Sequence, residues 1–153
     1  MQLTKLEIKN FRLITEAELV VDKDTTLIVG RNNTAKTSCM DFLSMILLKD
    51  SSISYDDYPL QQRKRAFIYL MQFIKGKYTY EKLIEKLPLP SITFHVDYSL
   101  ENNDDYLGHL SPFIIDVEED IITAIIKAEY NVKMTEKELE ELISSCFSPD
   151  END

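Results

Sequence analysis

The sequence predicts an α/β fold in which a strand leads into a helix through a short polar loop. Three observations support this fold class. Several short segments alternate apolar and polar residues, as half-buried strands do. Longer segments repeat apolar residues every three to four positions, as amphipathic helices do. The chain has 153 residues, 44% of them hydrophobic, which is enough for one domain with its own core.

The first thirty residues predict three strands. The alternating segment 4–11, TKLEIKNF, predicts the first strand, and residues 17–22, AELVVD, predict the second. A turn at 22–25, DKDT, would join the second strand to a third at 25–30, TTLIVG, as a hairpin. The unbroken apolar run at 27–29 predicts that this third strand is buried on both faces.

A helix is expected from about residue 37 to residue 49. One face carries apolar residues at i, i+3, i+4 and i+7; these are Cys39, Phe42, Leu43 and Ile46. Further apolar residues cover most of the other faces; these are Met40, Met45 and Leu47. We therefore expect this helix to be buried on several sides.

Two further helices are predicted within a helical insertion at about 55–90. They cover residues 60–75 and 79–87, and Gly76 would end the first of them. The alternating segment 91–100 predicts another strand. These elements read as an insertion in one lobe rather than as a second domain.

The C-terminal part predicts one more strand and one more helix. The β-branched segment 122–133 favours a strand. Residues 135–147 predict a helix that begins with a capping box made by Thr135 and Glu138. We therefore expect one lobe over residues 1–147 and a solvated acidic tail at 148–153.

The loop GRNNTAKTS, residues 30–38, nearly matches the phosphate-binding pattern G-x-x-x-x-G-K-[ST]. In such a loop, backbone N–H groups and the positive end of a helix bind phosphate. Lys36 would reach the β- and γ-phosphates, and the Thr37 hydroxyl would ligate Mg²⁺. The expected cofactors are therefore ATP and Mg²⁺. The predicted binding residues are Gly30, Arg31, Asn32, Asn33, Thr34, Ala35, Lys36, Thr37 and Ser38.

Ala35 stands where this pattern has its second glycine. If its φ is helical, the methyl group costs little. If its φ is positive, strain of about 1 kcal/mol or more follows. Under either alternative we expect nucleotide binding to be weakened but retained.

Composition limits the other function classes. The net charge of −10 argues against this segment gripping a nucleic-acid backbone by itself. The basic cluster QRKR at 62–65 is expected to be a solvated helix face rather than a DNA contact. No apolar run approaches the roughly 18 residues of a membrane helix, so no membrane partner is expected. The two scattered cysteines fit reduced thiols in a cytoplasmic protein.

The opening LEIKNFR, followed by LIVGRNNTAKTS, resembles the RecF/SMC-like ABC ATPases. More narrowly, it resembles the OLD family (overcoming lysogenisation defect), whose loop commonly reads G-x-N-N-x-G-K-T-[ST]. Six residues match that loop, namely Gly30, Asn32, Asn33, Lys36, Thr37 and Ser38. Ala35 departs from it. The resemblance is specific over residues 3–48 and loose over the later strands.

The resemblance implies an ATPase with a nuclease attached. In the OLD family, the ABC head binds ATP between two subunits, and a C-terminal Toprim domain cuts DNA with divalent metals. A homo-oligomer formed through the ATPase heads, DNA contact through a domain outside this chain, and a role in bacterial anti-phage defence follow from this likeness. Arg12 would lie near the nucleotide; the alternative is a solvated charge at the end of a strand.

Several motifs of such ATPases are absent from the sequence. There is no LSGGQ-like signature motif and no acidic set that would make a Toprim site. PFIIDVEED resembles a Walker B motif at Asp116, but Val117 stands where a catalytic glutamate would be. No catalytic residue is therefore predicted here. We expect the full-length protein to be an ATPase and DNA endonuclease, and this chain alone to bind nucleotide without turnover.

Two alternatives stay open beside the OLD hypothesis. One is a RecF/SMC-like DNA-repair ATPase without a nuclease. The other is a degenerate, non-catalytic P-loop module that serves subunit assembly. The residues beyond this chain would distinguish the first alternative, and nucleotide binding would distinguish the second.

Overall fold

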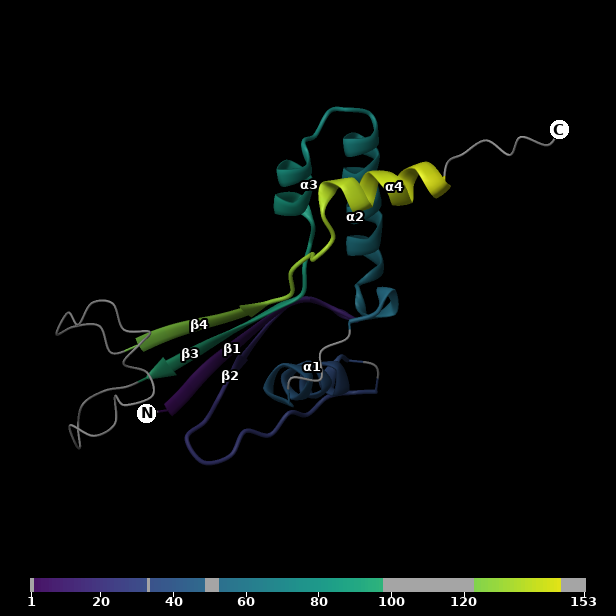
Figure 1. Ribbon diagram of the computed structural model, residues 1–153. Helices are drawn as coiled ribbons and strands as arrows, with labels where there is room; N and C mark the ends of the chain where they lie inside the picture. The colour runs from purple at the N-terminus through teal and green to yellow at the C-terminus, as the bar shows by residue number, and fades with distance from the viewer. Residues whose placement is uncertain (1, 33, 49–52, 98–122, 147–153) are drawn as a thin grey trace.

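A computed structural model describes residues 2–32, 34–48, 53–97 and 123–146. Its centre is a four-stranded sheet with the strand order β2-β1-β3-β4, and each neighbouring pair is antiparallel (Figure 1). The strands are β1 (Gln2–Phe11), β2 (Ile14–Val20), β3 (Ser91–Asp97) and β4 (Thr123–Glu129). The predicted strands at 4–11, 17–22, 91–100 and 122–133 are thus confirmed, with shifted ends. The parallel pairing of a mixed sheet is not found among these residues.

Strand β1 lies between β2 and β3, and its side chains point alternately to the two faces of the sheet. Leu6 and Ile8 point to the buried face, where each is 2% exposed. Lys5, Glu7 and Lys9 point to the opposite face, where their charges remain in contact with water. This period of two is the reason that the sequence of β1 predicts a strand.

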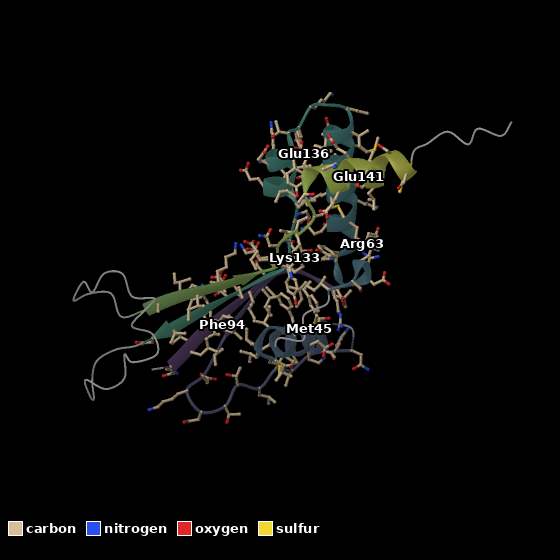
Figure 2. The ribbon with its side chains drawn as sticks, viewed as in Figure 1. Met45, Arg63, Phe94, Lys133, Glu136 and Glu141 are labelled. Atoms are coloured by element: carbon tan, nitrogen blue, oxygen red, sulfur yellow. The ribbon has the colours of Figure 1, made fainter. Side chains whose placement is uncertain are left out.

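Helix α1 (Lys36–Leu48) packs on the buried face of the sheet (Figure 1). Phe42 of α1 stacks on Phe11 of β1 with 4.5 Å between ring centroids, and neither side chain is exposed. Met45 of α1 and Phe94 of β3 pack against the same core (Figure 2). The helix therefore packs on the sheet through a hydrophobic core that includes this aromatic stack.

The expectation that α1 is buried on several sides is wrong. Cys39, Leu43 and Ile46 pack against the core, as their spacing predicts. In contrast, Met40 is 51% exposed and Leu47 is 64% exposed. The sheet covers one face of the helix, and no other described element covers the rest.

The remaining helices stand together beyond the end of the sheet where β1 ends and β3 begins (Figure 1). They are α2 (Leu60–Ile74), which follows the short 3₁₀ helix η1 (Tyr55–Asp57), then α3 (Tyr80–Lys86) and α4 (Glu136–Cys146). Gly76, at φ 68°, follows α2 as predicted. The capping box of α4 is confirmed, since Thr135 N–H donates to Glu138 Oε2 at 2.7 Å and Glu138 N–H donates to Thr135 Oγ1 at 3.4 Å.

The predicted third strand at 25–30 and its hairpin are wrong. The chain stays beside β1 until the Val21 N–H donates to the Thr4 carbonyl at 2.8 Å, and residues 25–30 then form no strand. Leu27 is 80% exposed and Val29 is 76% exposed. A strand buried on both faces needs a backbone neighbour and covering layers. The described residues supply neither to this segment.

Candidate phosphate-binding site

The loop at 30–35 joins this extended segment directly to the N-terminus of α1. Lys36 is the first residue of the helix, and the Cys39 N–H makes an early helical bond to the Ala35 carbonyl at 2.9 Å. The first four N–H groups of an α-helix have no partner inside the helix. Together with the helix dipole, they favour a bound anion. The predicted loop therefore leads into a helix N-terminus, as a phosphate-binding loop does, but no strand precedes it among the described residues.

Gly30 is needed because two parts of the loop approach each other closely. A Cβ atom at this position would lie 2.8 Å from Thr34 Oγ1, which is too short for a non-bonded contact. The same hydroxyl donates to the Arg31 carbonyl at 2.7 Å and closes the turn. A larger residue at position 30 would open the cradle in which a phosphate group would sit.

Lys36 folds back over the loop. Its Nζ donates to the carbonyl oxygens of Gly30 and Arg31 at 2.5 Å each, and lies 3.3 Å from Thr34 Oγ1. The positive charge is thus held beside the carbonyl groups of the loop.

Ala35 has a φ of 65°, so the left-handed alternative holds. For a residue with a Cβ atom, this conformation costs about 1–2 kcal/mol. The methyl group packs at the border of the hydrophobic core that includes Phe42, so the loop is anchored at this point. The backbone at position 35 thus has the left-handed conformation that glycine usually adopts, although the residue is alanine.

Thr37 and Lys36 share a depression beside the loop. Its volume is about 410 Å³, and it is lined by Thr26, Ile28, Lys36, Thr37 and Met40. The two residues predicted to meet the phosphates and Mg²⁺ therefore border one open space at the start of α1. Ser38 is 7% exposed and is less accessible to a ligand. Asn33 and Asp116 lie outside the described residues.

Arg12 is paired with two carboxylates, and its side chain is 38% exposed. Its Nε donates to Asp57 Oδ1 at 2.8 Å, and its other end forms a short ion pair with Asp41 of α1. These contacts raise the Arg12 pKa, with the hydrogen bond that Arg12 donates to Asp57 as the largest cause. The Arg12 charge is thus paired. These contacts direct it to Asp41 and Asp57, not to the loop at 30–35.

Sequence reasoning missed both carboxylate partners of Arg12. A signal was present for one of them, because Asp41 is the sole acidic residue of α1 and interrupts its apolar sequence. For Asp57 no such signal exists, since YDDY reads as an ordinary polar turn. The pairing depends on contacts between segments that lie far apart along the chain.

Other kinds of site are not found in the described part of the chain. Within it, no group of three or more His, Cys, Asp or Glu side chains could hold a metal ion. Among the described helices, none is both long enough and apolar enough to cross a membrane.

An α/β lobe with a phosphate-binding loop at the start of a sheet-packed helix defines a P-loop ATPase domain. The sequence model of the AAA ATPase domain family matches residues 1–152, and the chain belongs to this family. It is also 30% identical over 127 residues to "Structural maintenance of chromosomes protein 1" from Arabidopsis thaliana. That alignment covers 71% of this chain and 10% of the relative. No solved structure gives a significant match.

These matches confirm the broader part of the resemblance. The chain is an ATPase domain related to SMC/RecF-like ATPases. Membership of the OLD family, a nuclease and an anti-phage role stay predictions. Because the chain spans about a tenth of the length of the relative, the activity and partners of a whole protein belong to the proposals below.

Proposed function

We propose that this chain binds ATP with Mg²⁺ through residues 30–38 and acts as the nucleotide-binding lobe of a larger SMC/RecF-like ATPase. The observation that carries the proposal is the placement of Lys36 and Thr37 on one depression at the N-terminus of α1. Lys36 would leave the loop carbonyls and donate to the β- and γ-phosphates. Thr37 would ligate Mg²⁺, and the first N–H groups of α1 would bind the remaining phosphate oxygens.

Two features support a lobe rather than a complete ATPase. Leu27 and Val29 expose apolar side chains directly before the loop, where another part of an ATPase would cover them. Hydrolysis also needs a carboxylate that orients water, and none is assigned here. We therefore propose that turnover arises between two heads of a homo-oligomer, with residues outside this chain.

A binding titration tests the nucleotide site. Lys36→Ala removes the cation that would face the phosphates, so we expect ATP affinity to fall at least about tenfold. Thr37→Ala should weaken binding mainly when Mg²⁺ is present. The matched control is Lys64→Ala, which removes an exposed lysine of α2. This variant should bind ATP like the wild type. The proposal fails if Lys36→Ala and Thr37→Ala both titrate like wild type with and without metal.

A turnover assay tests the incomplete site. The 153-residue chain alone should release phosphate from ATP no faster than Lys36→Ala does. Steady turnover that disappears in Lys36→Ala would mean that the chain carries its own catalytic carboxylate.

The finer proposal is an OLD-type ATPase-nuclease in anti-phage defence, in which ATP controls DNA cleavage by a Toprim domain. The spelling GRNNTAKTS supports it. A full-length protein of this kind would nick DNA in the presence of divalent metal. A RecF/SMC-like repair ATPase would bind DNA without cutting it, and a degenerate assembly module would not bind ATP at all. A metal-dependent DNA cleavage assay separates the nuclease from the other two alternatives. A titration of ATP binding then separates the repair ATPase from the assembly module.

A further inference from the structure

We propose that Arg12 is a positioning residue that couples the start of the helical insertion to the phosphate-loop helix, so that ATP affinity depends on an Asp57–Arg12–Asp41 bridge. The inference rests on the proposed nucleotide site. It assigns Arg12 a role that works through α1 rather than through contact with the nucleotide.

The bridge joins three segments that are distant in sequence. The Arg12 side chain donates from Nε to Asp57 Oδ1 at 2.8 Å and from its terminal nitrogen to Asp41 on α1. The Arg12 backbone N–H also donates to the Asp57 carbonyl, at 2.5 Å. Arg12, in the turn between β1 and β2, thus makes one side-chain bond to α1. It makes two bonds to η1, one from its side chain and one from its backbone N–H. Charge-assisted hydrogen bonds of this kind are stronger than neutral ones.

The sheet holds Arg12 firmly in place. Its φ is 48°, and that of Asn10 is 60°, so a turn with two left-handed residues directs the side chain. The guanidinium lies 5.0 Å from the centre of the Phe11 ring, which stacks on Phe42. Asn10 Nδ2 also donates to the Leu89 carbonyl at 3.1 Å. Arg12 is thus attached to the core through Phe11 and, through the neighbouring Asn10, to the segment before β3.

On the insertion side, Asp57 is tied into η1 and α2. Its Oδ2 accepts from the N–H and the hydroxyl of Ser54 at 3.0 Å each. Arg63, at the lower end of α2 in Figure 2, donates to the carbonyls of Tyr58 at 2.8 Å and Asp56 at 2.9 Å. Burial raises the Asp57 pKa, but the hydrogen bonds from Arg12 and Ser54 outweigh this and leave it lowered. Asp57 is therefore charged at neutral pH, and Arg63 of α2 bonds to the residues on either side of it.

On the loop side, Asp41 lies one helical turn after Thr37. Residues four apart share a face of a helix, so a pull on Asp41 acts on the same side of α1 that carries Thr37. Asp41 is the sole acidic residue of α1. The bridge thus reaches the phosphate-binding end of α1 through a single side chain.

A contact between Arg12 and the nucleotide leads to the opposite expectation. Arg12 would have to release at least one carboxylate to reach a phosphate. Neutralising Asp57 would then free Arg12 and leave ATP affinity equal or tighter. Under the positioning role, the same change weakens ATP binding.

A double-mutant cycle with ATP affinity as the readout tests the bridge. Arg12→Gln and Asp57→Asn should each weaken ATP binding about three- to tenfold, and the double variant should bind no more weakly than either single variant. The matched control is the cycle of Lys9→Gln and Glu16→Gln, an ion pair of 2.8 Å on the same β1–β2 hairpin. That cycle should leave affinity unchanged. Arg12→Lys should recover part of the lost affinity.

A second readout needs no nucleotide. In Asp57→Asn, hydrogen exchange of the second turn of α1, where the N–H groups are bonded inside the helix, should be faster than in the wild type, while exchange in β1 and β3 stays the same. This comparison also separates loosening of α1 from unfolding of the whole chain.

Three results would overturn the inference: equal or tighter ATP binding by Asp57→Asn, losses that multiply in the double variant, or unchanged exchange in the second turn of α1. Its failure is distinguishable from failure of the nucleotide site. If wild type binds ATP and Lys36→Ala does not, but the Arg12–Asp57 cycle is additive, the coupling alone is wrong. If wild type does not bind ATP, the proposed function is wrong.

Discussion

Strand β2 and the segment 25–30 lie close together in the chain but behave differently. β2 pairs with β1 along its length, and cross-strand ion pairs join Lys5 to Glu18 at 3.4 Å and Lys9 to Glu16 at 2.8 Å. Segment 25–30 is the more apolar of the two, yet it forms no strand and exposes Leu27 and Val29. The difference shows that apolar content does not make a strand where no neighbouring backbone is available.

The phosphate loop lies between these two kinds of environment. On its C-terminal side, α1 is fixed to the sheet through Phe42. On its N-terminal side, Gly30 follows directly on the exposed segment. The position of the α1 side of the site is thus fixed by the core around Phe42. The position of the Gly30 side depends on what covers segment 25–30.

Truncation on the packed side should be the most damaging. Phe42→Ala removes a fully buried ring that stacks on Phe11, and we expect it to lower the free energy of unfolding by about 3–5 kcal/mol. Leu47→Ala, on the exposed face of the same helix, should change it by less than about 0.5 kcal/mol. Urea denaturation of both variants measures the contrast. Equal losses would mean that α1 is covered on both faces in solution.

Replacing Ala35 acts at the junction itself. Ala35→Gly relieves about 1–2 kcal/mol of left-handed strain but loosens the unfolded chain by about 0.4–1 kcal/mol. The net effect should be a rise of about 1–3 °C in melting temperature. It should also tighten ATP binding, because glycine adopts the positive φ of this position without strain.

Gly76→Ala is the reverse control for Ala35→Gly. Gly76 has a φ of 68°, and a methyl group there would meet no neighbouring atom, so the change isolates the cost of the backbone conformation. We expect a lower melting temperature for this variant. A fall in both ATP affinity and melting temperature for Ala35→Gly would show that the loop does not have this shape in solution.

A change in the exposed segment should matter least in this chain. Val29→Ser should alter the free energy of unfolding by less than about 0.5 kcal/mol, because the side chain is 76% exposed. Ile8→Val, in the middle of β1, should cost about 0.5–1.5 kcal/mol even though it removes a single methylene group. A loss above about 2 kcal/mol in Val29→Ser would show that segment 25–30 is buried in solution.

The sequence predicted those parts of the fold whose cause is local. The alternation around Leu6 and Ile8 predicted β1, and Thr135 with Glu138 predicted the start of α4. The error at 25–30 arose because an apolar run is typical of a buried strand but does not show whether a neighbouring strand is present. The same limit applies to Met40, whose burial would need a second layer over α1.

The candidate site divides in the same way. The spacing of Gly30, Lys36 and Thr37 predicted the loop and its position before a helix. The sign of φ at Ala35 could not be predicted, because it depends on how the loop meets the core. The partners of Arg12 were missed because Asp41 and Asp57 lie 29 and 45 residues away in sequence.

The outer strands of the sheet have a consequence for solubility. Among the described residues, no strand pairs with the outer edge of β2 or of β4, and a second copy of the chain could add a strand there. Both strands carry exposed charges, Glu16 and Glu18 on β2 and Lys127 and Glu129 on β4, and charged edges discourage such pairing. Segment 25–30 has no charged residue of this kind. At high concentration, self-association would therefore begin at the approach to the phosphate loop, and not at the sheet edges.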